Sequence, residues 1–260
     1  MSPNNIKAAM LRGETVVAMW SSTGSADLAE AAVHRGWPTL LIDNEHGVGN
    51  LDTAVAIHRA ALAAGGDCII RVPSSDPTHL KLVADRGFRS IMVPMINTAA
   101  EAKAIADAVR YPPRGMRGYA APVVRGSGFG ANGSYMRTAH QDFLLIAQIE
   151  HKDAVDNISE IAAVDGIDCL FLGPNDLAGS IGRLEELDHP DVLALCERVE
   201  RETLAAGKLF GSIVRPDRSP TKLKEVGCTL IAGPSDLSIF LKGAVDAKAD
   251  FPFLAHPAKG

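Results

Sequence analysis

Eight short apolar runs recur along the chain, and each is separated from the next by a stretch with helical character, often rich in alanine. The runs lie at 15–21, 39–45, 67–72, 90–95, 144–150, 167–172, 208–214 and 228–233. Strands that alternate with helices in this way form parallel sheets. Eight such units predict an α/β fold, a (β/α)8 TIM barrel. We expect residues 1–260 to form this single barrel domain.

Start and stop signals place the helices between these runs. Asp76 precedes Pro77, which is the arrangement of an N-cap followed by proline in the first turn. Ser219-Pro220 repeats it, and Thr98 with Glu101 forms a capping-box pattern. Three glycines are placed to end helices in the left-handed conformation, namely Gly36, Gly207 and Gly227.

One segment interrupts this rhythm. Residues 111–141 include a glycine-rich stretch at 126–130 and look like one long loop. Loops of this length in compact domains are uncommon and are usually functional or disordered. We therefore expect either a lid over the site or a segment that contacts a neighbouring subunit.

Four of the apolar runs end abruptly in charged groups. They continue into Asp43-Asn44-Glu45-His46, Arg71, Glu150 and Gly173-Pro174-Asn175-Asp176. A buried strand does not normally end in this way, because an unpaired charge in a low dielectric is costly. Active sites of TIM barrels lie at the carboxyl ends of the strands. The four endings therefore predict one site at that rim.

Glu150 and Asp176 follow the fifth and sixth runs, so they lie on adjacent strands of the predicted barrel. Two carboxylates with water ligands make the oxygen-rich, half-open coordination that suits Mg²⁺ or Mn²⁺. A single Asp after a strand is a helix N-cap about as often as it is a functional residue. The pairing of Asp176 with Glu150 on the neighbouring strand is what favours a metal site. A near-copy, Gly233-Pro234-Ser235-Asp236, follows the eighth run, which is not beside the fifth. We expect Asp236 to cap its helix instead.

Arg71 and His46 are the candidate cation and base of the site. Arg71 carries a rigid fork of donors that suits a keto oxygen or a developing enolate oxygen. Its alternative is a structural salt bridge across the barrel rim. His46 directly follows an acidic pair at a strand end and titrates near neutral pH, so it is a candidate general base. His151, beside Glu150, is the weaker rival.

Composition narrows the class of protein. The net charge is −5 and no run of Lys or Arg occurs, which argues against a nucleic-acid partner. No apolar run approaches membrane-spanning length and no signal-peptide pattern is present, so we expect no membrane partner. Four cysteines form no Cys-x-x-Cys pair, which argues against a zinc or disulfide framework and fits a cytoplasmic location. Cys68 and Cys169 fall inside strands and are expected in the core.

Taken in order, these residues resemble the HpcH/HpaI aldolase family of metal-dependent (class II) pyruvate aldolases. The resemblance runs from about Ala18 to Leu241. The motifs that carry it are Asp43-x-Glu45-His46, Arg71-Val-Pro, Val93-Pro94-Met95, Tyr111-Pro-Pro-x-Gly115-x-Arg117-Gly118, Gln148-Ile149-Glu150 and Gly173-Pro174-x-Asp176-Leu177. It implies a barrel whose last helix packs on a neighbouring subunit, in a homo-oligomer that is usually a hexamer built as a trimer of dimers.

The resemblance also implies an activity and its parts. The reaction is the reversible cleavage of a 4-hydroxy-2-oxo acid to pyruvate and an aldehyde. Glu150 and Asp176 would bind a divalent cation, Mg²⁺, Mn²⁺ or Co²⁺, and Arg71 would stabilise the pyruvate enolate. His46 would belong to the base machinery, with Asp85 as its acidic partner. The further residues implied in substrate binding are Trp20, Gln148, Gly173, Pro174 and Asn175, with Arg71 and Asp176.

The place of Asp85 constrains its role. It ends the third predicted helix, which runs from the carboxyl rim of the barrel to the opposite end. Its own His46 should therefore be far away, and Asp85 can serve a site only across a subunit interface. Asn175, where the family often has alanine, and the glycine-rich loop at 120–133 depart from the family pattern.

Three other functions stay open. A Schiff-base (class I) aldolase needs a lysine inside the barrel, whereas Lys152 and Lys208 only flank strands. A related metal-dependent lyase or decarboxylase, acting on oxaloacetate or an acyl-CoA, would have much the same site, but no basic CoA-binding patch is evident. A barrel that serves only binding or assembly is disfavoured because the charged residues at the strand ends are intact.

Overall fold

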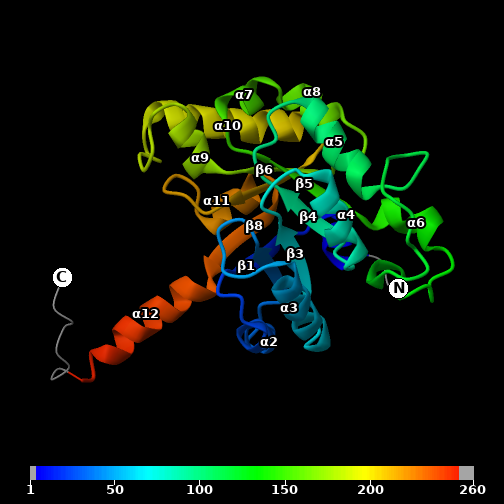
Figure 1. Ribbon diagram of the computed structural model, residues 1–260. Helices are drawn as coiled ribbons and strands as arrows, with labels where there is room; N and C mark the ends of the chain where they lie inside the picture. The colour runs from blue at the N-terminus through cyan, green and yellow to red at the C-terminus, as the bar shows by residue number, and fades with distance from the viewer. Residues whose placement is uncertain (1–3, 252–260) are drawn as a thin grey trace.

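The computed structural model describes residues 4–251 and shows a closed barrel of eight parallel strands, in the order β1 to β8, with β8 beside β1 (Figure 1). The predicted (β/α)8 barrel is confirmed, and each predicted strand overlaps one in the structure. The strands are β1 (Val16–Ser21), β2 (Thr39–Asp43), β3 (Asp67–Arg71), β4 (Ser90–Val93), β5 (Leu144–Ile149), β6 (Cys169–Leu172), β7 (Leu209–Ile213) and β8 (Cys228–Ser235).

Helices surround the barrel and follow the strands in sequence. They are α1 (Asn5–Leu11), α2 (Ala26–His34), α3 (Leu51–Ala63), α4 (Pro77–Asp85), α5 (Ala99–Val109), α6 (Tyr135–Asp142), α7 (Lys152–Asp156), α8 (Ile158–Ala163), α9 (Pro174–Ser180), α10 (Pro190–Ala205), α11 (Pro220–Glu225) and α12 (Asp236–Lys248). The predicted caps are present: Asp76 accepts from the N–H of His79, and Thr98 and Glu101 form the capping box. Gly36, Gly207 and Gly227 have φ of 95°, 69° and 91°, as expected of helix-ending glycines.

The apolar strands bury both faces, which is why they read as nearly continuous apolar runs. In β2, Leu41 belongs to the cluster that fills the barrel, whereas Leu40 and Ile42 pack against the surrounding helices. Helix α1, which the sequence did not suggest, supplies Ile6 and Met10 to the interior cluster and so closes the amino-terminal end of the barrel. Both Cys68 and Cys169 are buried, as predicted.

The segment 111–141 is not one continuous loop. It contains a short 3-10 turn, η1 (Arg125–Ser127), and most of α6. Arg117 is fully buried under the ring of Tyr111 and donates two hydrogen bonds to Asp85 at the end of α4. The lid expected over the site of the same chain is therefore wrong, because these contacts hold the segment against the far end of α4. The expected subunit contact stays a prediction.

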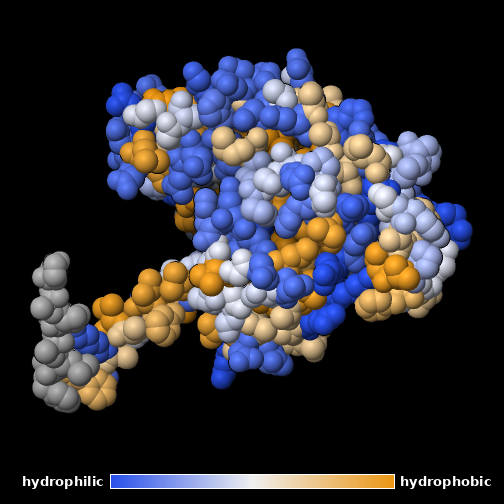
Figure 2. All heavy atoms as spheres, viewed as in Figure 1, coloured by the Kyte–Doolittle hydropathy of each residue, from blue (hydrophilic) through white to orange (hydrophobic). Residues whose placement is uncertain are grey.

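The last helix leaves the barrel. Figure 1 shows α12 running outward from β8, and Figure 2 shows apolar residues along it. Its exposed large apolar side chains are Leu237, Ile239, Phe240, Leu241 and Val245. None of the helices within residues 4–251 has the length and hydropathy needed to cross a membrane.

Candidate active site

A pocket of about 230 Å³ lies at the carboxyl ends of the strands, where the barrel architecture places catalytic groups. It brings together eight residues that the sequence predicted, from five different strands or the turns after them. They are Trp20, His46, Arg71, Gln148, Gly173, Pro174, Asn175 and Asp176. Phe171 and Ile213 also line it, and the sequence did not suggest them because they read as ordinary strand residues.

Arg71 is fixed by three neighbours. The parallel register places Asp43 beside it, and Asp43 accepts two hydrogen bonds from Nε and Nη2 at 3.0 and 2.8 Å. Glu45 lies 3.0 Å from Nη1. The guanidinium carbon also sits 4.5 Å from the centre of the Trp20 ring. A cation held in this way has little freedom to rotate away from a ligand.

Asp43 also shapes the turn that carries His46. Its Oδ1 accepts the backbone N–H groups of Glu45 and His46, which fixes the chain just after β2. Burial by itself would raise the pKa of Asp43, but the hydrogen bonds and charge of Arg71 outweigh it, so the pKa lies below its ordinary value. Asp43 is therefore the charged partner that keeps Arg71 in place.

Glu150 is a buried carboxylate whose surroundings disfavour its charged form. Burial, together with the nearby charges of Asp176 and Glu45, raises its pKa to about 7 against the opposing effects of the Met95 hydrogen bond and the charge of Arg71. Oε1 accepts the backbone N–H of Met95 at 2.7 Å. Met95 adopts φ of 55°, a costly conformation for this side chain, to make that contact.

Two further features form a cradle around Glu150. A Cβ on Gly173 would lie 2.5 Å from Oε2 of Glu150, so only glycine lets the end of β6 approach this closely. Gln148 donates from Nε2 to the same Oε2, and its buried Oε1 has no partner in the described part of the chain. Within residues 4–251, no three His, Cys, Asp or Glu side chains are grouped so that they could hold a metal unaided.

The donor set nevertheless fits a divalent cation. Glu150 and Asp176 supply carboxylate oxygens, and Gln148 supplies an unpartnered carbonyl oxygen. The pKa of Glu150 is raised by burial and by the charges of Asp176 and Glu45, which a cation would offset. Hard cations such as Mg²⁺ take oxygen ligands and usually keep several waters. The two-carboxylate arrangement expected from the sequence is thus consistent with the geometry.

His46 and Asp85 are not brought together within the chain. The His46 side chain is 69% exposed at the mouth of the pocket, with Nε2 3.9 Å from Oε2 of Glu45. Asp85 is absent from the pocket lining and is engaged by Arg117. The expectation that Asp85 cannot reach His46 in its own subunit agrees with this arrangement.

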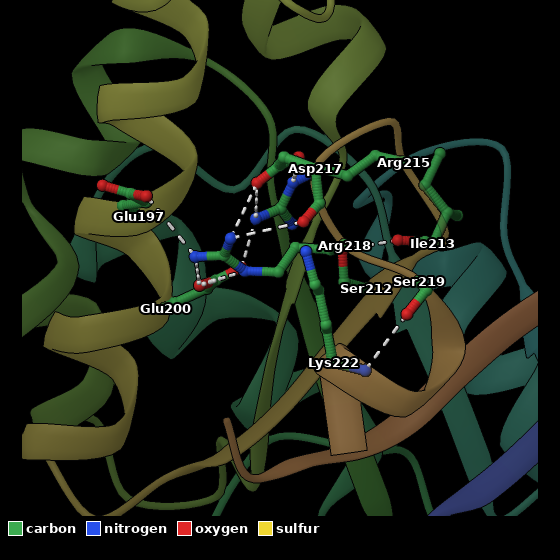
Figure 3. Close-up of polar contacts among 9 residues, drawn as sticks. All are labelled: Glu197, Glu200, Ser212, Ile213, Arg215, Asp217, Arg218, Ser219 and Lys222. Carbon is green, nitrogen blue, oxygen red and sulfur yellow. Dashed lines mark hydrogen bonds and ion pairs between the residues drawn. The ribbon is translucent and has the colours of Figure 1, made fainter. Parts of the chain in front are cut away.

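The end of β7 contributes one residue to the pocket, and the turn that follows β7 is held by ion pairs to α10 (Figure 3). Ile213 lines the pocket, and two residues later Arg215 is fully buried and paired with Glu200 of α10. Arg218 joins the same carboxylate at 3.1 Å, and Asp217 lies 2.9 Å from Nε of Arg215. These ion pairs fix the turn to α10.

Comparison with known proteins decides the family. The family model for HpcH/HpaI aldolase/citrate lyase matches residues 17–242. The chain belongs to the HpcH/HpaI aldolase/citrate lyase family. It is 41% identical over 244 residues to a 4-hydroxy-2-oxovalerate aldolase of Novosphingobium aromaticivorans, covering 94% of this chain and 92% of the relative.

Two further proteins support this family membership. A hydroxypyruvate/pyruvate aldolase of Agrobacterium fabrum is 33% identical over 91% of this chain and 89% of its own length. The crystal structure of an HpcH/HpaI aldolase/citrate lyase family protein from Burkholderia cenocepacia superposes with a TM-score of 0.89, at 34% identity, over 95% of this chain and 98% of that one. The predicted resemblance is confirmed.

The second Gly-Pro-x-Asp copy in this HpcH/HpaI chain is structural, but it does not act as expected. Ser235, not Asp236, is the N-cap of α12. Asp236 instead accepts hydrogen bonds from the backbone N–H groups of Ser22 and Thr23 and from the Thr23 hydroxyl. It ties the end of β8 to the turn after β1. The prediction of a helix cap was wrong because it ignored the neighbouring strand in the closed barrel.

Proposed function

We propose that the protein is a class II pyruvate aldolase that cleaves a 4-hydroxy-2-oxo acid reversibly to pyruvate and an aldehyde. One observation carries the proposal: a clamped arginine, Arg71, lines the same pocket as Asp176 and Gln148, and Gln148 is hydrogen-bonded to the buried carboxylate of Glu150. A cation site beside a fixed guanidinium suits a substrate that develops negative charge on a keto oxygen. The names of the relatives, pyruvate and 4-hydroxy-2-oxo acid aldolases, support it.

Glu150 and Asp176 would hold the divalent cation, Mg²⁺, Mn²⁺ or Co²⁺. When bound, such a cation acts as a Lewis acid that polarises the keto group and lowers the barrier to proton loss from the neighbouring carbon. Gln148 would accept a hydrogen bond from a water or substrate hydroxyl at its free Oε1. The dense packing of Gly173 against Glu150 would keep that carboxylate in one position.

The turn after β6 would receive the substrate carboxylate. The backbone N–H of Gly173 is committed to the carbonyl of Ile149 at 3.1 Å, so it does not serve as a donor here. The N–H groups of Asn175 and Asp176 have no acceptor among the described residues and would donate instead. Pro174 and Trp20 would form the apolar walls beside them.

Arg71 and His46 would carry the charge and the proton. Arg71 donates to the keto oxygen and stabilises the negative charge that develops there when a proton or a carbon–carbon bond is lost. His46 lies at the solvent side of the pocket, where it would move a proton to or from the 4-hydroxyl oxygen, directly or through water. Its exposure suits a residue completed by another subunit.

We also propose that the whole chain forms one cytoplasmic catalytic unit that works as a homo-oligomer, a hexamer built as a trimer of dimers. The exposed apolar face of α12 would pack on a neighbour. Asp85 would then act on the His46 of another subunit. The four buried free cysteines suit a reducing compartment.

A retro-aldol screen over 4-hydroxy-2-oxo acids, coupled to pyruvate detection, tests the activity. Cleavage should disappear in EDTA and return on adding Mg²⁺, Mn²⁺ or Co²⁺. Oxaloacetate belongs in the screen, since decarboxylation would use the same groups. Full activity in a verified metal-free sample would falsify the class II assignment.

A matched pair of variants tests the metal site. Glu150→Gln should lose metal affinity, measured by titration calorimetry, because a carboxylate ligand becomes neutral. Asp236→Asn, in the second Gly-Pro-x-Asp copy, should keep it even if the fold becomes less stable. Loss of affinity in Asp236→Asn with retention in Glu150→Gln would mean that the metal binds elsewhere. Borohydride with pyruvate should trap nothing, because no lysine lines the described pocket.

A further inference from the structure

A second cavity, of about 420 Å³, lies at the opposite end of the molecule from the catalytic pocket. It is enclosed by the end of α5, the turn after it and α6, which leads into the amino-terminal end of β5 (Figure 1). Its lining residues are Val109, Arg110, Tyr111, Pro112, Pro113, Arg114, Met136, Arg137, Ala139 and His140. The aldolase proposal uses none of them.

The lining is cationic. Three arginines and a histidine face the cavity, and neither aspartate nor glutamate lines it. Within residues 4–251, Arg114 and Arg137 make no ion pair, whereas most other arginines of the chain are paired with carboxylates. Two uncompensated guanidinium groups on one cavity create a strong local positive potential.

Arg110 lines the same cavity and is fixed in place. Its side chain is 9% exposed and is held by Asp165, whose Oδ2 accepts from Nη1 at 2.8 Å and whose carbonyl accepts from Nη2 at 2.9 Å. Gly166 permits this placement, since a Cβ there would lie 2.8 Å from the guanidinium carbon. Its Nε is also buried, and it has no partner in the described part of the chain. A buried unsatisfied donor is costly, and a bound acceptor would remove that cost.

We propose that this cavity, which Arg110, Arg114 and Arg137 line together, binds a small dianion, a phosphate group or a dicarboxylate. Guanidinium forks match the oxygen geometry of both groups. Asp165 neutralises Arg110, so the two free arginines leave a charge of about +2, which a dianion balances. The volume exceeds that of one phosphate and admits a phosphorylated small molecule.

Titration calorimetry in EDTA tests the site, with inorganic phosphate, pyrophosphate and succinate as probes. The titrations are made at a low salt concentration of about 50 mM, so that the attraction between the arginines and the anion is only weakly screened. The double variant Arg114→Gln/Arg137→Gln should raise the dissociation constant at least tenfold. Arg201→Gln, which removes an exposed arginine of α10, is the matched control and should bind as the wild type does. Preference for phosphate or for succinate identifies the dianion class.

Equal affinity in all three proteins would overturn the proposal, because binding would then lie elsewhere, for example in the catalytic pocket. So would the absence of binding of every probe to the wild type. Since catalysis is not the readout, failure here is distinct from failure of the aldolase assignment.

His140 offers a second measurement that also locates the ligand. Burial lowers its pKa, and Arg114, Arg110 and Lys7 lower it further, while Asp165 opposes them. A dianion in the cavity should raise the pKa of His140. NMR titration measures this pKa, and the His140→Gln variant assigns the resonance. The double variant should show a higher starting pKa and no further rise. An unchanged His140 pKa in the presence of a bound probe would place that probe outside the cavity.

Discussion

At the residue scale, Arg71 combines structural salt bridges with the catalytic role that we propose for it. Nε and Nη2 donate to Asp43, and Nη1 is paired with Glu45. A guanidinium has five N–H donors, so about two remain for a ligand. The carboxylates therefore orient the fork without consuming it.

Arg71→Lys should lower kcat by about 10²-fold, the scale of losing one oxyanion-hole donor. Lysine keeps the charge but cannot bridge Asp43, Glu45 and a substrate oxygen at once. Exchange of the pyruvate methyl protons, followed by NMR in heavy water, should slow in parallel. A variant with normal exchange and only a raised KM would assign Arg71 to substrate binding.

His58 gives a residue-scale prediction about stability. It is buried, stacked on Phe88 with ring centroids 4.6 Å apart, and its Nδ1 faces Nη1 of Arg125 at 3.1 Å. Burial, with the positive charges of Arg125 and Arg89, lowers its pKa to about 3. Because the folded state resists a proton that the unfolded state accepts, its contribution is complete above pH 6.5 and declines as the pH falls toward 3.

The wild type should therefore lose roughly 2 kcal/mol of unfolding free energy through His58 between pH 7 and pH 5. His58→Gln, which keeps an acceptor but does not titrate, should lack this component. Equilibrium denaturation at both pH values measures the difference, and His34→Gln on the exposed face of α2 is the control. Identical pH dependence in wild type and His58→Gln would contradict the assignment.

At the element scale, the turn that follows β7 is held in place by helix α10. Glu200 of α10 pairs with both Arg215 and Arg218, and all three side chains are largely buried (Figure 3). Removing one partner from such a cluster leaves a buried charge uncompensated. Because Ile213 precedes this turn and lines the pocket, the cluster sets the shape of the site at a distance.

Glu200→Gln should lower the free energy of unfolding by about 3 kcal/mol, and it should raise KM for the cleaved substrate more than it changes methyl-proton exchange. Glu197→Gln is the matched control, since Glu197 is 57% exposed and lies 3.5 Å from the same Arg218. Its effect should stay below about 1 kcal/mol. Equal destabilisation by the two variants, measured by equilibrium denaturation, would show that Glu200 does not hold the turn after β7 more firmly than Glu197 does.

At the scale of the whole molecule, helix α12 extends away from the barrel and exposes large apolar side chains. Phe240 is 64% exposed and Val245 is 71% exposed. Apolar patches of this kind usually mark an interaction surface. A neighbouring subunit would bury them.

Phe240→Asp should shift the protein to smaller assemblies, because a charge in an apolar interface is strongly disfavoured. Sedimentation velocity measures the change. Lys242→Gln, on the same helix and exposed, should leave the assembly intact. An unaltered sedimentation coefficient in Phe240→Asp would remove α12 from the interface.

Mixed oligomers test whether His46 and Asp85 meet between subunits. His46→Ala and Asp85→Asn should each be inactive in aldol cleavage, and His46→Ala should affect oxaloacetate decarboxylation less, because no hydroxyl proton moves there. Reassembled mixtures should regain part of the activity, since some interfaces carry both wild-type groups. No recovery in demonstrably mixed oligomers would exclude action across the interface.

The sequence alone determined the barrel and most of the site. Apolar runs that alternate with capped helices specify parallel strands, and a closed parallel barrel brings all the carboxyl ends of its strands to one rim. Charged residues at those ends must therefore converge, whatever the helices do. For this reason the sequence predicts that His46, Arg71 and Asp176 meet, and the three line one pocket, whereas Gln148 was implied only by the family resemblance.

Only the tertiary structure decided which of these charges pair and how firmly. Arg117 is predicted to lie in a loop, yet it is fully buried against Asp85 because three aromatic rings and the end of α4 enclose it. Asp236 reads as a cap, yet it holds the turn after β1. Such partners lie far apart along the chain, and burial is what makes one pairing favourable over another. The local sequence pattern does not show which charged side chains become buried. It therefore predicted where the site lies but not the contacts that hold the site together.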